Sequence, residues 1–244
     1  MTVLVISQPM LFPWVGMFEQ IRLADIFVYY VDVQFSKGSF VNRVQIKTSS
    51  GIKWLTVPLL GVRLGQKIKE VEVNYQKDWR HRHFEFLRQT YKAAPYKHDV
   101  MDLVSTVYAE KHPTIDALSR KSMDVVIDYF GLNHDLQSYL SSSLNLKGKS
   151  SQRVLDVVKH FQADEYVTGH GASNYLDHEI FEQNGVKVAY MNYLKKAYLQ
   201  DFGEFTPYVS ILDLIAHCGV EGVNNICSNA IYWKDFFNGP YRDL

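Results

Sequence analysis

The chain has 244 residues, 47% of them hydrophobic, and its 26 basic residues balance its 26 acidic residues. This composition excludes intrinsic disorder, and a chain of this length can bury a large core without a disulfide or a metal ion. The two cysteines, Cys218 and Cys227, fit a reducing compartment and lack the second pair that a zinc site would need. No apolar run approaches the roughly 20 residues that span a bilayer, and the apolar N-terminus carries no basic segment. We therefore expect a cytoplasmic protein with no membrane partner and no metal site.

The first thirty residues follow the order strand, loop, helix, strand. Residues 2–7 are apolar and mostly β-branched and predict a buried strand, and two prolines make residues 8–16 an irregular loop. Apolar positions over 17–24 have helical spacing, and the β-branched and aromatic run at 25–30 predicts a second strand. This order is typical of a βαβ unit in a parallel sheet.

The rest of the chain predicts an insertion and then a return to alternating helices and strands. We expect a hairpin with strands at 40–46 and 54–60, and a half-buried strand at 67–74. Further elements are predicted as helices at 78–93, 114–130, 150–161, 174–183 and 210–219 and as strands at 165–168 and 186–191. The expected fold is one α/β domain over 1–244: a mostly parallel, Rossmann-like sheet with an inserted β-hairpin region and a helical middle at 78–145.

A basic segment breaks the overall neutrality of the chain. Lys37 to Lys69 contains seven Lys or Arg residues and no Asp or Glu, so its positive potential attracts anions. Polar side chains at its start and just before it could point at one ligand from an extended strand, with arginine gripping a phosphate in two-pronged fashion. The residues in question are Asp32, Gln34, Lys37, Asn42 and Arg43. The alternative is an exposed edge strand whose charges deter aggregation.

The loop that follows the first predicted strand is a second candidate site. In open α/β sheets ligands bind beyond the carboxyl ends of the strands. There Gln8 could donate a hydrogen bond, Trp14 could stack on a ring, and Gly16 would permit close approach. The alternative is that the prolines only shape the loop and that Trp14 packs in the core.

Two later segments could also contact an anionic substrate. Ser150, Ser151 and Arg153 open a predicted helix, where N–H groups, hydroxyls and a cation favour an anion, although a serine there could equally be an ordinary helix cap. The second segment, 168–177, places His170 between two glycines, where it could act as a general base, with Asn174 and Asp177 near enough to orient it or a substrate. The alternative is a glycine turn with a solvated histidine.

Several stretches together resemble the WbqC-like family of bacterial surface-polysaccharide gene clusters. They are QPMLFPWVGMFEQI, ADIFVYYVDVQFSKGSFVNRVQIK, GIKWLTVPL, KSSQRVLDVV, YVTGHGASNYLD and FTPYVSILDL, which are spread over nearly the whole chain. The resemblance implies a role beside enzymes that make and decorate nucleotide-linked amino sugars for O-antigen, and thus a substrate class. It does not imply a reaction mechanism.

The chain is also similar, more weakly, to the pantothenate-synthetase-like, HIGH-type nucleotidyl-transfer fold. There too a prolyl loop after the first strand leads into a helix, and the next strand ends in a segment like VDVQF. The paired-histidine nucleotide motif of that fold is absent from QPMLFPWVG, so ATP use is not implied. No cofactor is indicated by the sequence.

These observations lead to two functional hypotheses and one weaker one. In the first, an acyl- or aminoacyltransferase modifies the amine of a nucleotide-linked amino sugar, with Lys37, Arg43 and Arg153 on the diphosphate and His170, oriented by Asp177, as base. In the second, a non-catalytic protein binds the nucleotide sugar or a partner enzyme. Nucleic acid is a poor third candidate for a neutral chain, and the oligomeric state stays open, with a homo-oligomer among the options.

Overall fold

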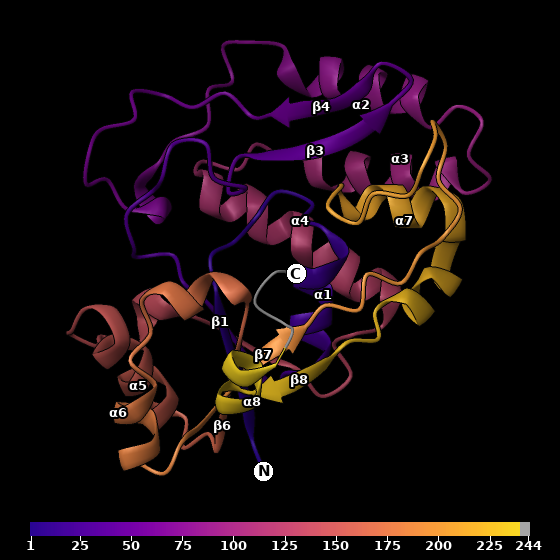
Figure 1. The fold of residues 1–244 in the computed structure, drawn as a ribbon. Helices are drawn as coiled ribbons and strands as arrows, with labels where there is room; N and C mark the ends of the chain where they lie inside the picture. Colours follow the sequence, from indigo (N-terminus) through magenta and orange to yellow (C-terminus); the bar gives the residue numbers. More distant parts are fainter. Residues whose placement is uncertain (240–244) are drawn as a thin grey trace.

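A six-stranded, mostly parallel sheet forms the centre of the fold in the computed structural model, which describes residues 1–239 (Figure 1). The strand order is β5-β2-β1-β6-β7-β8, and only β8 runs antiparallel to its neighbour. The strands are β1 (Val3–Ser7), β2 (Ile26–Tyr29), β5 (Gln137–Leu140), β6 (Glu165–Thr168), β7 (Lys187–Asn192) and β8 (Asn229–Tyr232). Because β1 is central, both of its faces must be covered, which is why its sequence is continuously apolar.

The alternation of side chains along β1 divides the core between two layers of helices. Leu4 and Ile6 face a cluster built with α5 (Ser150–His160), α6 (His178–Gln183) and α8 (Trp233–Asn238). Val5 faces the opposite cluster, which includes residues of α1 (Val15–Arg22), α4 (Ile115–Phe130) and α7 (Ile211–Cys218). The sheet is therefore the middle layer of a three-layer α/β structure.

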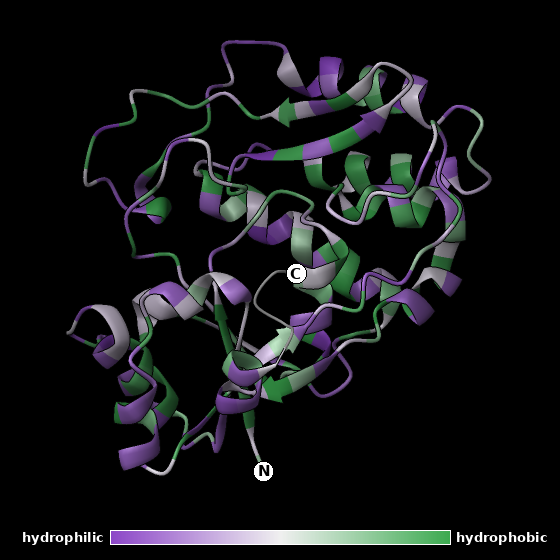
Figure 2. Ribbon diagram, viewed as in Figure 1, coloured by the Kyte–Doolittle hydropathy of each residue, from purple (hydrophilic) through white to green (hydrophobic). Residues whose placement is uncertain are grey.

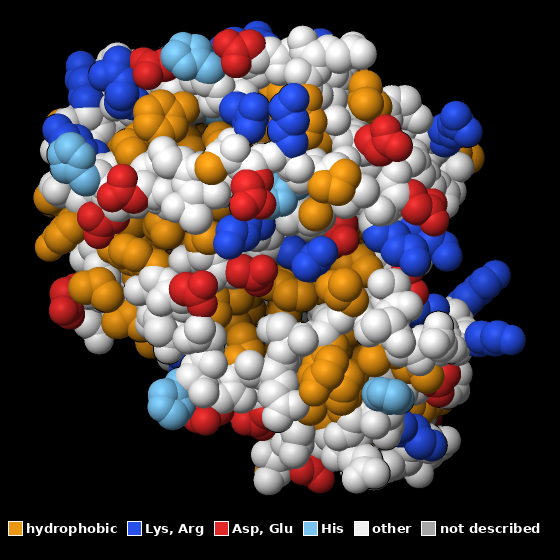
Figure 3. Space-filling model, turned by 180° about the vertical axis from the view of Figure 1, so that it is seen from behind, with side chains coloured by type: hydrophobic (Ala, Val, Ile, Leu, Met, Phe, Trp, Pro, Cys, Tyr) orange, Lys and Arg blue, Asp and Glu red, His pale blue; other side chains and the backbone are white. Residues whose placement is uncertain are grey.

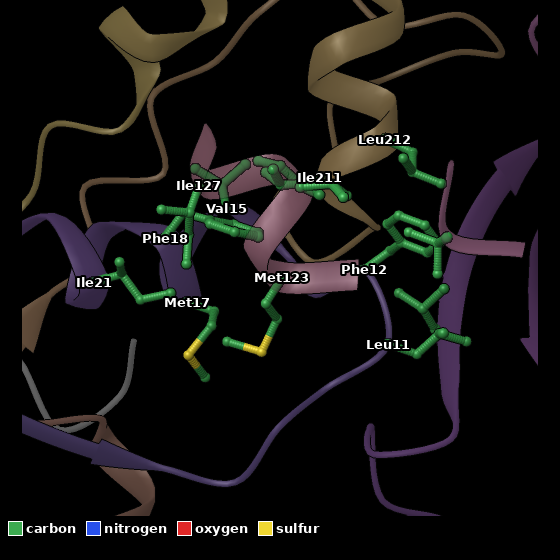
Figure 4. Packing of buried hydrophobic residues seen from close by; sticks show 14 of the residues in the cluster. Leu11, Phe12, Val15, Met17, Phe18, Ile21, Met123, Ile127, Ile211 and Leu212 are labelled. Carbon is green, nitrogen blue, oxygen red and sulfur yellow. The ribbon is translucent and has the colours of Figure 1, made fainter. Parts of the chain in front are cut away.

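Segments far apart in the sequence meet in the second cluster (Figure 4). Met17 of α1 lies beside Met123 of α4, and Ile211 of α7 packs close to Val15. Phe12, in the loop before α1, is fully buried next to this group. The cluster therefore anchors the loop that follows β1 to two helices from later in the chain.

A long insertion between β2 and β5 forms the upper part of the molecule as drawn in Figure 1. It contains the antiparallel hairpin of β3 (Arg43–Thr48) and β4 (Gly51–Thr56), the short 3-10 helix η1 (Ile68–Glu70), α2 (Trp79–Thr90), α3 (Lys97–Tyr108) and α4. α3 is amphipathic, and its buried residues Val100, Val104 and Val107 recur at helical spacing, in keeping with its contacts to α2, α4 and α7. Figure 2 shows hydrophobic segments along this helix. The insertion has a core continuous with that of the sheet, because α4 packs against both.

The expected α/β class, parallel sheet and inserted hairpin are confirmed, but three details of the sequence reading are wrong. The strand expected at 67–74 is a 3-10 turn with single bridges, because its N–H groups bond to neighbouring loops, as in Ile68 to the carbonyl of Val33. The helix expected at 174–183 starts only at His178, where the carboxylate of Asp177 caps it by accepting from the N–H of Glu179. The sequence reading also missed α3, β5, β8 and α8.

No helix within residues 1–239 is both long and apolar enough to cross a membrane.

Candidate functional site

A cavity of about 550 Å³ opens at the carboxyl ends of β1, β6 and β7. The chain leaves β1 toward β2 on one side, and β6 lies on the other, so the cavity sits where the strand order reverses. This is the position at which open α/β sheets bind ligands. The lining residues are Ile6, Ser7, Gln8, Met10, Trp14, Met17, Gln20, Tyr30, Val154, Tyr166, Thr168, Gly169, His170, Gly171, Ala172, Tyr175, Met191, Tyr193, Lys195 and Tyr208.

The loop after β1 is held in one conformation by bonds to distant segments. The N–H of Phe12, a residue with φ of 38°, donates to the hydroxyl of Ser122 on α4 at 2.9 Å. On the other side, the hydroxyl of Ser210 donates to the carbonyl of Phe12 at 2.8 Å, and the N–H of Ile211 donates to the carbonyl of Pro13 at 2.8 Å. Two prolines keep this buried loop out of regular structure, and these bonds provide partners for its backbone N–H and carbonyl groups. The side chains of the loop are therefore fixed relative to the sheet.

Trp14 forms an aromatic wall of the cavity together with two tyrosines. Its ring lies 4.8 Å from that of Tyr193 in an edge-on arrangement and 5.8 Å from that of Tyr208. Close packing against α1 is possible only because residue 16 is glycine: a Cβ there would lie 2.0 Å from the indole ring. Such a wall offers a stacking surface to a planar or sugar ring.

His170 lies on the opposite side, in the turn that follows β6. Its Nε2 is 2.7 Å from the carbonyl oxygen of Met191, and its ring packs 4.9 Å from that of Phe236. Since a carbonyl can only accept, we assign the proton to Nε2, which leaves the lone pair of Nδ1 available in the neutral ring. The histidine is therefore oriented by the backbone of β7, and it can accept a proton at Nδ1.

Three further polar side chains reach the cavity without a hydrogen-bond partner among the described residues. They are the amides of Gln8 and Gln20 and the ammonium of Lys195, which lies 5.5 Å from the ring centre of Tyr208. Gln20 is almost fully buried, at 5% exposure, and Gly169 leaves room for it, since a Cβ at 169 would lie 3.3 Å from its amide nitrogen. The side chains of Gln8 and Lys195 are partly exposed, so all three groups are free to bind a ligand that enters the cavity.

The lining of the cavity carries one cation and no carboxylate. It contains Lys195 but no Asp or Glu. Burial raises the pKa of Tyr30 and of Tyr193, so both phenols stay neutral at pH 7, and that of Tyr193 donates to the carbonyl of Pro207 at 2.9 Å. A ligand that carries negative charge and a ring suits this combination best.

Of the residues predicted from sequence, Gln8, Trp14 and His170 come together in this cavity. Asp32 and Arg153 lie beside it as a largely buried ion pair, with 2.5 Å between carboxylate and guanidinium. Asp32 also accepts from the hydroxyl of Ser141. The guanidinium lies 5.6 Å from the centre of the Tyr30 ring, so this pair can influence the cavity through a residue that lines it.

The polar segment that begins the basic stretch lies elsewhere. Lys37 and Gln34 are exposed, and the side-chain amide of Asn42 donates to the carbonyl of Val57 at 2.9 Å inside the insertion. Arg43 stacks on Trp54, with 4.0 Å from the guanidinium carbon to the ring centre, and bonds to the carbonyl of Gly38. None of these four residues lines the cavity, so the loop at 8–16 and the turn at 168–177 converge there without the polar segment at 32–43.

The remaining predicted residues make local structural contacts. The hydroxyl of Ser151 accepts from the N–H of Asp177 at 2.9 Å, while Ser150 and Asn174 are exposed. The carboxylate of Asp177 caps α6, and no hydrogen bond or ion pair joins it to His170 within residues 1–239. The orienting contact expected from Asp177 is therefore supplied by the carbonyl of Met191.

Sequence reasoning missed Gln20, Tyr193 and Lys195. Tyr193 and Lys195 lie just beyond the carboxyl end of β7, which is where ligands bind in open α/β sheets, so their position after a strand is a signal in the sequence. Lys195 also has φ of 51°, which is unusual for a residue other than glycine. For Gln20 the sequence holds one indication of a role in the site: it is a polar residue on the buried side of a short amphipathic helix.

No group of three or more His, Cys, Asp or Glu side chains in the described part of the chain is placed to hold a metal ion.

Comparison with known proteins gives a family but no established activity. The uncharacterized protein Rv1507c of Mycobacterium tuberculosis is 33% identical over 212 residues, which cover 86% of this chain and 90% of that protein. No solved structure matches the chain. The model of the WbqC-like protein family matches residues 8–225, a span that includes every polar cavity residue identified above except Ser7. This chain is therefore a member of the WbqC-like protein family.

Proposed function

We propose that the protein transfers an acyl or aminoacyl group to the amine of a nucleotide-linked amino sugar in surface-polysaccharide biosynthesis. The observation that carries the proposal is a cavity at the strand-order reversal that combines an aromatic wall, unpaired amides, a cation and an oriented histidine, with no carboxylate in its lining. A nucleotide sugar has the matching parts: a planar base, a diphosphate and a polar sugar.

Each part of the substrate has a counterpart in the cavity. The base or sugar ring stacks on Trp14, the diphosphate pairs with Lys195, and the amides of Gln8 and Gln20 bind hydroxyl or phosphate oxygens. The amine then lies near Nδ1 of His170. A volume of about 550 Å³ is within the range of cavities that enclose small molecules and cofactors.

The chemistry that follows is amide formation. The amine nitrogen bonds to the carbonyl carbon of an activated donor such as a thioester, the carbon–sulfur bond breaks, and the thiolate leaves. The proton lost by the amine moves to Nδ1 of His170 and from there to the departing thiolate, which restores the neutral ring. The carbonyl of Met191 keeps Nε2 protonated and fixes the direction of the lone pair.

The proposal is tested by turnover with a defined amine. Purified protein is incubated with UDP-glucosamine and either acetyl coenzyme A or an aminoacyl thioester, and amide product is followed by mass spectrometry. We expect product, and a loss of about 100-fold or more for His170→Ala, the usual contribution of a general base. The exposed His160 at the end of α5 provides the control, and His160→Ala should keep full activity. Unchanged turnover by His170→Ala would remove the proposed base.

A second function, binding of the nucleotide sugar without turnover, is favoured by one observation. The cavity lining holds a single histidine and no acidic residue that could share the work of proton transfer. In that case UDP-glucosamine raises the melting temperature of the protein in a concentration-dependent way, yet no donor gives product.

A further inference from the structure

We propose that the protein has a second binding site, for a small phosphate-bearing molecule, in a groove between β4 and α2. The groove has a volume of about 840 Å³ and lies in the insertion, at the end of the molecule opposite α5 and α6 (Figure 1). It shares no lining residue with the cavity at the strand ends. The proposal does not depend on the function proposed for that cavity.

One side of α2 forms a long wall of this groove. Trp79, Arg82, Phe86 and Gln89 line it, and their spacing of three, four and three residues places them along one face of the helix. The facing wall is β4 with the hairpin turn before it. The groove is therefore formed by two regular elements.

Four cations surround the groove, and none is neutralised by a carboxylate. Lys53 comes from β4, Lys77 precedes α2, Arg82 lies on it, and Lys92 follows it. No Asp or Glu lines the groove, and no ion pair involves these four side chains within residues 1–239. On the same helix, by contrast, Arg88 is paired with Glu85 at 2.7 Å. In a chain with balanced charges, four unpaired cations around one groove create a local potential that favours an anion.

The histidine at the base of the groove adds no charge to it. His83 is buried, with Nε2 3.1 Å from the carbonyl of Thr56 and Nδ1 3.1 Å from the hydroxyl of Tyr108. A carbonyl acceptor at one nitrogen and a hydroxyl at the other match a neutral ring with its proton on Nε2. His83 therefore shapes the floor, and the charge for binding comes from the lysines and Arg82.

The other lining residues indicate what accompanies the phosphate. Phe86 and the 44%-exposed Phe202 supply apolar surface, and Ser49 and Ser50 supply hydroxyls at the hairpin turn. A nucleoside phosphate or a phosphorylated sugar has both a charged end and a less polar body. A small ligand fits better than a polynucleotide, because the chain carries no net charge. On the face drawn in Figure 3, Lys and Arg side chains are interspersed with acidic ones.

The test separates this groove from the strand-end cavity, which could also bind phosphate through Lys195. Inorganic pyrophosphate is titrated by calorimetry into the full chain carrying Lys195→Gln. We expect binding to remain in this background and to weaken at least tenfold when Lys53→Gln and Arg82→Gln are added. Both side chains are exposed, so folding should be unaffected, and thermal unfolding checks this point. If the doubly substituted chain does not fold, Lys77→Gln and Lys92→Gln at the two ends of the groove replace it.

The matched control removes two positive charges away from the groove. Lys121→Gln with Lys147→Gln, both at exposed positions, should leave pyrophosphate affinity within twofold. The proposal is overturned if Lys195→Gln abolishes all binding, if the groove substitutions have no effect, or if the control weakens binding equally. It is also overturned if an oligonucleotide binds through the groove residues and pyrophosphate does not.

Discussion

Gly16 determines where Trp14 can lie, and through Trp14 it shapes the aromatic wall of the strand-end cavity. Alanine in a helix is ordinarily more favourable than glycine by about 0.5–1 kcal/mol. Here a Cβ at position 16 would overlap the indole ring, so the ring must leave its place beside Tyr193. At this residue, helix propensity therefore favours alanine, whereas the packing of Trp14 requires glycine.

We predict that Gly16→Ala weakens binding of UDP-glucosamine at least tenfold and lowers the free energy of unfolding by about 1–3 kcal/mol, the usual cost of overpacking. Calorimetric titration and urea unfolding measure the two effects. Gly171 lines the same cavity, but a Cβ there would meet nothing within 4 Å. Gly171→Ala should therefore change neither quantity much, and equal effects of the two substitutions would contradict this account of Trp14.

His83 makes stability depend on pH in the acidic range. Burial lowers its pKa from 6.5 to about 4, although the hydrogen bond to Thr56 opposes the shift. Between these values the unfolded chain binds a proton that the folded chain excludes. The stabilisation is therefore complete above pH 6.5 and is lost as the pH falls toward 4.

We predict that His83 removes about 3 kcal/mol from the free energy of unfolding between pH 7 and pH 4. Urea unfolding across this range, compared with His83→Gln, isolates the effect from the titration of carboxylates. Glutamine can donate to Thr56 and accept from Tyr108, but it cannot be protonated in this range. Identical pH profiles for the two proteins would show that His83 is not the group responsible.

The ion pair of Asp32 and Arg153 connects two elements on which the strand-end cavity depends. Asp32 lies just after β2, at the start of the insertion, and Arg153 lies in the first turn of α5. Both side chains are only 13–14% exposed, so loss of one partner leaves a charge poorly solvated. The pair thus holds the insertion against the helix beside Tyr30.

We predict that Asp32→Asn lowers the free energy of unfolding by about 3 kcal/mol, as is usual when one partner of a buried pair is removed. Arg153→Gln should restore part of that loss in the double variant, giving a coupling energy of roughly 1 kcal/mol or more in a double-mutant cycle. Additive effects of the two substitutions would mean that the pair does not hold these elements together.

Regular elements with a strong local signal could be predicted from the sequence, and elements fixed by distant contacts could not. β1 is continuously apolar and α4 has a threonine cap and a left-handed glycine at its end, so both were found close to their observed bounds. β5 is short and largely exposed, and only its pairing with β2 makes it a strand. Residues 67–74 alternate between apolar and polar side chains, but their backbone groups bond to separate loops. The periodicity of a segment does not reveal which partners its backbone will have.

The candidate site also divides into residues that the sequence could predict and residues that only the packing of the whole molecule places. Gln8, Trp14 and His170 were found because each follows a strand, and strand ends of a parallel sheet meet. Lys37 and Arg43 belong to a basic segment without acidic residues, which is typical of an anion-binding site, but the insertion places them away from the cavity. Where a loop of the insertion comes to lie depends on packing between α2, α3, α4 and α7, which no single segment of the sequence encodes.

The proposed function requires that the cavity at the ends of β1, β6 and β7 bind a nucleotide-linked amino sugar. A crystal structure of the protein with UDP-glucosamine tests it most directly. We expect the ligand between Trp14 and His170, with the diphosphate at Lys195 and the amine within hydrogen-bond distance of Nδ1 of His170. A ligand bound only in the groove between β4 and α2, or a strand-end cavity that stays empty at saturating concentration, would contradict it.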